Sequence, residues 1–121
     1  MREDNTIQII CKEFALRIIK LYVYLKDNKQ EYVLSKQVLR SGTSIGANAR
    51  ESINAQSSMD FINKLNIALK EANETQYWFE VMLKSSIIND IEYTSINNDL
   101  AELLALLTTI IKTSKKKQLS D

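Results

Sequence analysis

The chain has 121 residues, of which 45% are hydrophobic and 26% charged, with a formal net charge of +1 and neither proline nor histidine. The lack of histidine excludes Ser-His and Cys-His nucleophile pairs and the Glu-x-x-His ligands of di-iron bundles, and a single cysteine excludes an internal disulfide and a zinc cluster. No stretch reaches the ~18–20 apolar residues that cross a bilayer, so we expect one cytoplasmic domain, residues 1–121, without catalytic residues, cofactor or metal.

The first helix is expected at about residues 4–27, because apolar residues recur there at spacings of three and four. This stripe consists of Ile7, Ile10, Cys11, Phe14, Ile18, Leu21, Tyr22 and Leu25. Cys11 is therefore expected to be a small buried hydrophobic residue of the core. The polar residues 27–30 end the helix.

Three further helices are expected at about residues 32–54, 58–87 and 90–113, separated by short polar breaks. Ser57 with Asp60, and Asn89 with Glu92, have the spacing of capping pairs before the third and fourth helices. The expected core stripes are Leu34, Val38, Ser41, Gly42, Ile45, Ala49 and Ile53; Phe61, Leu65, Ala68, Leu69, Ala72, Gln76, Phe79 and Leu83; and Ile96, Leu100, Leu103, Leu104, Leu107, Ile110 and Ile111. Four amphipathic helices with short connections indicate an all-α, antiparallel up-down-up-down four-helix bundle.

Both glycines of the chain, Gly42 and Gly46, lie inside the second expected helix. A glycine inside a helix costs about 1 kcal/mol relative to alanine, so this pair needs a compensating tertiary contact. On a helical wheel Gly42 faces the core and Gly46 lies on its flank, which indicates a close approach to a neighbouring helix. An anion-binding turn is the alternative, but the segment lacks the glycine spacing and the lysine of a phosphate loop.

Another face of the second helix carries hydrogen-bonding groups among small residues. Arg40, Ser44, Ala47, Asn48 and Glu51 recur there at spacings of four, three, one and three. Arg40 and Glu51 are too far apart to pair on one helix, so we expect their partners on another helix, another subunit or a ligand. Arg40, Ser44, Asn48 and Glu51 are therefore a candidate partner-binding stripe, and an exposed polar face without a partner is the alternative.

The run LSKQVLRSGTSIGAN at residues 34–48, together with Glu51, resembles the signature of a small bacterial "four helix bundle protein" family. Some members of that family are encoded in intervening sequences of 23S ribosomal RNA genes. The resemblance continues in the third helix at Phe61, Leu65, Ala68, Glu71, Glu74, Thr75 and Trp78. It implies bundles that associate as ring-like homopentamers. A related branch is the accessory protein of diversity-generating retroelements, a basic pentamer that binds a reverse transcriptase and nucleic acid.

Two features depart from this family pattern. Residues 49–51 read Ala-Arg-Glu where the family commonly has Ile-Ala-Glu, so a charge stands beside the signature. The net charge of +1 also lacks the strong basicity of the retroelement branch, which weakens a nucleic-acid role carried over from it.

The third expected helix has more apolar surface than one core needs. Its additional apolar residues, expected roughly opposite Phe61, Leu65 and Phe79, are Ile67, Trp78, Val81 and Ile88. A tryptophan away from the core indicates burial against another chain, and a wide core face is the alternative. Glu71 and Glu74 flank this stripe and are expected to meet basic groups such as Arg40 across a contact. The candidate subunit interface therefore consists of Ile67, Glu71, Glu74, Trp78 and Val81.

The fourth expected helix ends in a basic run, Lys112 and Lys115 to Lys117, after residues 90–111, which contain four acidic residues and no lysine or arginine. Cations at a helix C-terminus complement the helix dipole, but in a ring they would also repeat with the symmetry and attract phosphate. Lys112, Lys115, Lys116 and Lys117 are therefore candidate nucleic-acid contacts. We expect a non-enzymatic homo-oligomeric adaptor, a pentamer on the resemblance, that binds RNA or a nucleic-acid-processing protein. A purely protein-binding scaffold is the alternative.

Overall fold

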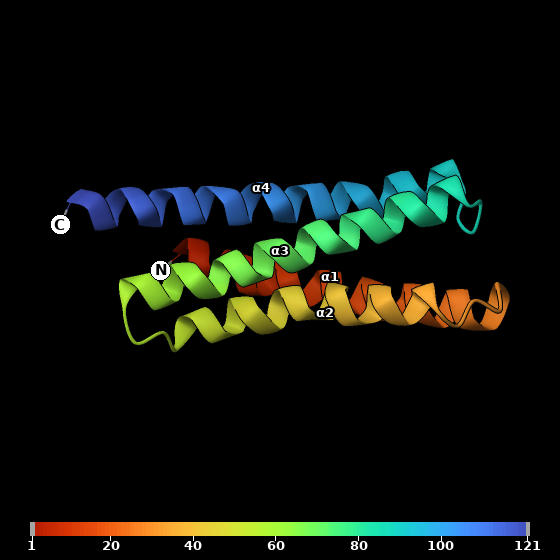
Figure 1. Ribbon diagram of the computed structural model, residues 1–121, viewed down its shortest axis with the longest axis horizontal. Coiled ribbons are helices and arrows are strands. Elements are labelled where there is room, and N and C mark those ends of the chain that lie inside the picture. Colours follow the sequence, from red (N-terminus) through yellow and green to blue (C-terminus); the bar gives the residue numbers. More distant parts are fainter. Residues whose placement is uncertain (1, 121) are drawn as a thin grey trace.

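The computed structural model describes residues 2–120 of the chain, with side chains described for residues 6–119. These residues form four helices and no strand: α1 (Arg2–Asn28), α2 (Leu34–Ile53), α3 (Ser58–Lys84) and α4 (Asp90–Ser120). Figure 1 shows each helix running back along the one before it. The predicted all-α four-helix bundle is confirmed. No helix within residues 2–120 is long and apolar enough to cross a membrane.

One core of apolar side chains, drawn from all four helices, holds the bundle together. Ile18, Ile45, Phe79 and Leu103, one from each helix in turn, are completely buried within it. α2 packs against α1 and α3, and α3 packs against α4, whereas α1 and α4 contact each other least of the four neighbouring pairs. The seam between α1 and α4 is therefore the most open side of the bundle.

Two helix ends differ from the sequence expectation for local reasons. α2 begins at Leu34 because the Glu31 carboxylate accepts the backbone N–H of Ser35 at 2.7 Å and so caps the first turn. α3 ends at Lys84, three residues earlier than expected, because Ser86 adopts a left-handed backbone with a φ of 63°.

The C-terminal end of α4 was predicted too short. The helix continues to Ser120 instead of ending at about residue 113, because residues 114–119 include three lysines, a glutamine and a leucine, all good helix formers, and no glycine or proline. The last buried residue of α4 is Ile111. Figure 1 shows the turns that follow extending past the ends of the other helices.

Both predicted capping pairs are present. The Ser57 hydroxyl accepts the backbone N–H of Asp60 at 3.0 Å. Asn89 and Glu92 bond reciprocally, each side chain accepting the other residue's backbone N–H, at 2.8 and 2.9 Å. Such pairs satisfy N–H groups that the first helical turn leaves unbonded, so they fix where α3 and α4 begin.

One position of the predicted core stripes and one of the predicted outer stripe are wrong. Ile53 is exposed, and Ser52 is buried in its place with its hydroxyl donating to the carbonyl of Ala49 at 2.7 Å. Ile88, expected on the outer stripe of the third helix, is buried in the core, because α3 has already ended and the chain turns inward before α4. The core also takes up Ser35, Ile62, Thr75 and Met82, which lie outside the predicted stripes.

Gly42 and Gly46 set the distance between α1 and α2. A Cβ atom added at Gly42 would lie 2.7 Å from Cγ1 of Ile18, and one added at Gly46 would lie 3.3 Å from Cβ of Cys11. Both glycines are helical, which excludes the alternative of an anion-binding turn. The predicted role in close helix packing is confirmed.

Candidate interaction surfaces

Arg40 on α2 is joined to two carboxylates of α3 in the same chain. Its Nη1 donates to Oε2 of Glu71 at 3.2 Å, and its Nη2 donates to Glu74. Glu74 also accepts the indole N–H of Trp78 at 3.3 Å. The expected meeting of Arg40 with Glu71 and Glu74 therefore occurs between neighbouring helices of one subunit. Because Arg40 is half exposed, these ion pairs each contribute at most about 1 kcal/mol.

The other polar groups of the candidate partner-binding stripe are bonded mainly to their own helix. The Ser44 hydroxyl donates to the carbonyl of Arg40 at 2.6 Å, and the Asn48 amide donates to the carbonyl of Ser44 at 2.8 Å. Glu51 is exposed. The four residues thus share one outer face of α2, and partner binding there stays a prediction.

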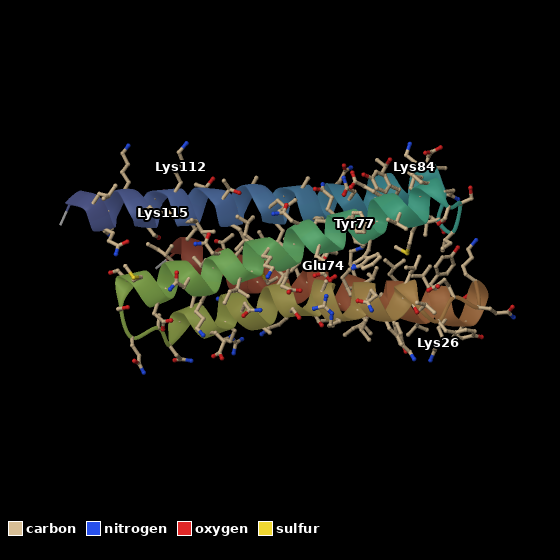
Figure 2. The ribbon with its side chains drawn as sticks, in the orientation of Figure 1. Lys26, Glu74, Tyr77, Lys84, Lys112 and Lys115 are labelled. Carbon is tan, nitrogen blue, oxygen red and sulfur yellow. The ribbon has the colours of Figure 1, made fainter. Side chains whose placement is uncertain are left out.

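The candidate interface on α3 lies beside this stripe. The ion pairs of Arg40 show the antiparallel register of α2 and α3, and that register places Ile67 at about the level of Asn48. Ile67 is 42% exposed, whereas Trp78 is partly buried against the core and Val81 is half buried. Figure 2 shows Glu74 midway along α3. The two predicted surfaces therefore adjoin, but most of the tryptophan is covered within the subunit.

A row of exposed apolar side chains lies on α1, where the sequence analysis placed no site. Ile9, Leu16, Ile19 and Val23 are 44–59% exposed. Their spacings of seven, three and four put them on one face of α1, opposite the buried face that contains Ile18. We call these four residues the α1 row. The sequence contains this second apolar stripe at helical spacing. It was not singled out as a site because the core stripe was enough to predict the helix.

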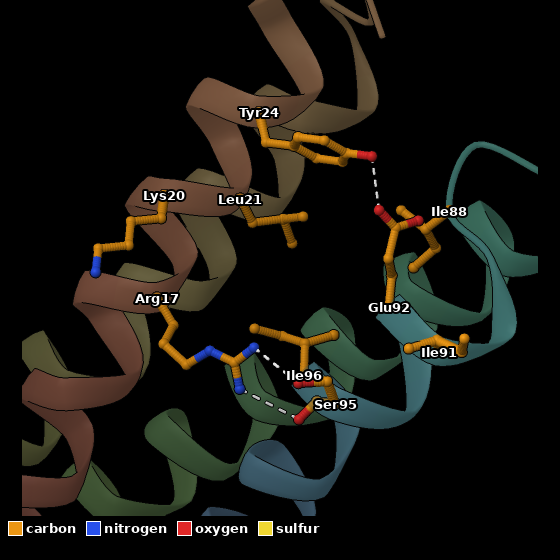
Figure 3. Close-up of a pocket in the computed structure, with 9 residues that line it drawn as sticks. All are labelled: Arg17, Lys20, Leu21, Tyr24, Ile88, Ile91, Glu92, Ser95 and Ile96. Carbon is orange, nitrogen blue, oxygen red and sulfur yellow. Dashed lines mark hydrogen bonds between the residues drawn. The ribbon is translucent and has the colours of Figure 1, made fainter. Parts of the chain in front are cut away.

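A pocket of about 430 Å³ lies in the seam between α1 and α4, near the end of α1 and the start of α4, and Figure 3 shows it. We call this the upper part of the seam. Its apolar lining consists of Leu21 from α1 and Ile88, Ile91 and Ile96 from the segment that enters and begins α4. Ile91 is 81% exposed. An apolar side chain from another molecule that entered this pocket would therefore contact apolar residues of both α1 and α4.

Arg17 crosses the seam below this pocket. It donates to Oδ2 of Asp99 at 2.6 Å, to the carbonyl of Ser95 at 3.2 Å and to the Ser95 hydroxyl at 3.1 Å. A second pocket of about 260 Å³ lies on the other side of Arg17, between Ile10, Glu13 and Phe14 of α1 and Asp99 and Glu102 of α4. The seam is thus a shallow, divided groove along about four turns of α1.

The upper end of the seam is closed by a bond between Tyr24 and Glu92. The Tyr24 hydroxyl donates to Oε2 of Glu92 at 2.6 Å. This bond, helped by the backbone N–H of Asn89, lowers the pKa of the Glu92 carboxyl, and the same bond raises the pKa of Tyr24. The carboxylate that caps α4 therefore also ties α4 to α1.

The four candidate nucleic-acid contacts form an exposed basic tip at the C-terminal end of α4. Lys112, Lys115, Lys116 and Lys117 are all exposed, and the first three share one helix face by their spacing. Figure 2 shows Lys112 and Lys115 toward the end of the molecule opposite to Lys26 and Lys84. Nucleic-acid contact at this tip stays a prediction.

Two further observations concern chemical reactivity. Cys11 is buried in the core, as predicted, and burial raises the pKa of its thiol to about 12. Among the described side chains, no group of three or more histidine, cysteine, aspartate or glutamate residues could hold a metal ion.

Comparisons with known proteins agree with the fold and with the family resemblance. The sequence model of the 23S rRNA-intervening sequence protein family matches residues 3–109, and no curated protein matches the chain. A crystal structure of a protein with unknown function from the S23 ribosomal protein family of Bacteroides thetaiotaomicron is 56% identical to it. The two superimpose with a TM-score of 0.89 over 91% of this chain and 98% of that one. The chain therefore belongs to the 23S rRNA-intervening sequence protein family.

Proposed function

We propose that this protein is a non-enzymatic adaptor that assembles into a ring of identical bundles, a pentamer on the family resemblance, and binds RNA through its repeated basic tips. The observation that carries the proposal is the α1 row, four apolar side chains about half exposed on the face of α1 opposite the core. Monomeric proteins rarely expose large contiguous apolar patches, and such patches mark interaction sites. A second copy of the chain is the partner we assign to this row.

The free energy available from the α1 row favours a closed ring over an isolated contact. Fully burying a Leu, Ile or Val side chain contributes about 1.5–3 kcal/mol, and these four are about half buried already. Covering the remainder therefore contributes roughly 4 kcal/mol per interface. Association costs at least about 4 kcal/mol, so the row needs an apolar acceptor and further contacts. In a closed ring every subunit forms two interfaces, which adds the contacts that a single pair lacks.

RNA is the favoured partner because of where the lysines lie. One tip with Lys112, Lys115, Lys116 and Lys117 is a weak phosphate site, and the net charge of the chain is only +1. Cyclic symmetry places a tip from every subunit at the same height on the ring. Phosphate binding grows with the number of contacts made together, so the assembly binds RNA although the single chain is almost neutral.

The RNA proposal is tested by the fluorescence anisotropy of a short labelled single-stranded RNA. Replacing Lys115, Lys116 and Lys117 by Glu should abolish binding without changing the assembly mass. The same charge change at the opposite end, Lys26, Lys36 and Lys84 to Glu, is the matched control and should leave most of the affinity. If the protein contacts about four phosphates, raising the salt concentration from about 50 to 200 mM should weaken binding roughly 50-fold. Undiminished binding by the variant with the reversed tip would refute the assignment of the tip.

A protein-binding scaffold is the second candidate function, and one observation favours it. Arg40, the basic group of the α2 stripe, is compensated by Glu71 and Glu74 within the subunit, which leaves this surface without an excess of positive charge for binding phosphate. Partner binding that hardly responds to salt, together with no binding of the labelled RNA, would select this function. In both cases the protein should still assemble.

A further inference from the structure

We infer that the α1 row of one subunit docks into the α1/α4 seam of the next subunit, so that the ring is built from one repeated contact between unlike surfaces. The inference rests on the proposed homo-oligomer and names the two surfaces that make it. The occupant of the seam is thus a second copy of this chain.

The α1 row and the α1/α4 seam have the same length and lie at the same level along α1. The α1 row extends from Ile9 to Val23, which is about 21 Å of helix. The two pockets of the seam take their α1 lining from residues between Ile10 and Tyr24. Rotation about an axis parallel to the bundle keeps every residue at its own height. The row of one subunit therefore faces both pockets of its neighbour over its full length.

Both surfaces are apolar where they would meet. The upper half of the row, from Leu16 to Val23, faces the larger pocket with its lining of Leu21, Ile88, Ile91 and Ile96. Ile91 is the most exposed of these residues and stands at the mouth of a pocket that α1 and α4 leave open to solvent. Docking would cover Ile91 and the α1 row together.

The charges of the two surfaces are complementary at the smaller pocket. Lys12 is exposed on α1 between the positions of Ile9 and Leu16. At that height the neighbour presents the lower pocket, where Glu13 and Glu102 lie. Residues 90–111, which form the α4 side of the seam, contain four acidic side chains and no lysine or arginine. Lys12 of the row therefore meets the carboxylates of Glu13 and Glu102. Arg17, which also lines the seam, is already paired with Asp99.

The two surfaces lie on different sides of α1, so the contact cannot close on itself as a symmetric dimer. At 100° per residue the centre of the α1 row and the centre of the seam-lining residues of α1 are about 115° apart. Contacts between unlike surfaces form rings when the rotation closes. The angle between the two surfaces is therefore that of a contact which continues from one subunit to the next.

The test is the solution mass, by light scattering, of variants that disable one surface each. Leu16→Asp disables the row, Ile91→Asp disables the seam, and Ile53→Asp is the matched control, because Ile53 is 56% exposed and Leu16 58%. We expect the wild type and Ile53→Asp to assemble and each of the other two variants to be monomeric. Circular dichroism checks that each variant remains helical.

The possible failures separate this inference from the proposed function. A monomeric wild type would overturn both. An assembled wild type whose mass is unaffected by Leu16→Asp would overturn the docking inference alone, and loss of assembly in Ile67→Asp would then place the interface on α2 and α3. Assembly that survives Ile91→Asp would overturn the seam as the acceptor of the α1 row.

Discussion

Replacing Gly42 by alanine tests whether the close approach of α1 and α2 is essential to the bundle. The added Cβ would lie 2.7 Å from Cγ1 of Ile18 and 2.9 Å from both Cδ1 and Cγ2. Ile18 is completely buried, and its branch at Cβ restricts rotation about χ1, so the side chain cannot swing into solvent. The two helices must move apart or the surrounding core must shift.

Two effects of opposite sign set the size of the change. Alanine contributes about 1 kcal/mol more than glycine inside a helix, whereas overpacking a well-packed core costs typically about 1–3 kcal/mol and occasionally more. Three contacts below 3.0 Å place this site at the upper end of that range. The free energy of unfolding should therefore fall by roughly 1–2 kcal/mol, which corresponds to roughly 4–10 °C in Tm for a domain of this size.

Gly46→Ala is the matched control in the same helix. Its Cβ would come within 3.3 Å of Cβ of Cys11 and no closer than 3.7 Å to any other neighbour, so it should keep most of the gain in helix propensity. Urea unfolding followed by circular dichroism, at one fixed subunit concentration because assembly adds to stability, measures both variants. Equal stability of the two would refute the packing argument. Combining Gly42→Ala with Ile18→Ala should show a favourable interaction energy of at least about 1 kcal/mol.

Three other predictions concern single side chains. Cys11, whose pKa burial raises to about 12, should not react with Ellman's reagent at about pH 8 until urea unfolds the protein; rapid reaction of the folded protein would contradict its burial. Thr75→Val removes the 2.8 Å hydrogen bond between two buried hydroxyls, those of Thr75 and Ser41, and should cost about 1–3 kcal/mol in urea unfolding. The Tyr24 hydroxyl lowers the pKa of Glu92, so the stability that this bond contributes is present above the unfolded-state pKa of about 4.3 and is lost as pH falls through the lower folded-state value. Tyr24→Phe should therefore flatten the acid limb of the stability profile, and an unchanged limb would mean that the bond does not persist in solution.

The helices and their starts could be predicted because each is specified by neighbours in the sequence. Apolar spacing of three and four gave the buried face of α1 around Ile18, and the pair Asn89 and Glu92 marked the start of α4. Gly42 could be assigned to a close contact because its cost in helix propensity requires one. Only the identity of the residue that Gly42 packs against, Ile18, could not be predicted without the structure.

Other features depend on contacts that a single sequence does not reveal. Hydrophobicity favoured Ile53 over Ser52 for the core, but Ser52 can be buried because its hydroxyl bonds to a carbonyl of its own helix. The tryptophan on α3 indicated a second chain, yet Trp78 is largely satisfied by Glu74 and the core of its own subunit. The α1/α4 seam joins residues far apart in the sequence, such as Arg17 and Asp99. No local sequence pattern predicts such a pair.

The thin contact between α1 and α4 bears on how fast the chain folds. The three better-packed seams join helices that follow one another, across the connections at residues 29–33, 54–57 and 85–89. Only the α1/α4 seam requires the two ends of the chain to meet, and the entropy of closing such a long loop opposes an early meeting. Proteins dominated by local contacts fold in microseconds to milliseconds. This chain should therefore assemble as successive helical hairpins, with its first and last helices coming together when the rest is already in place.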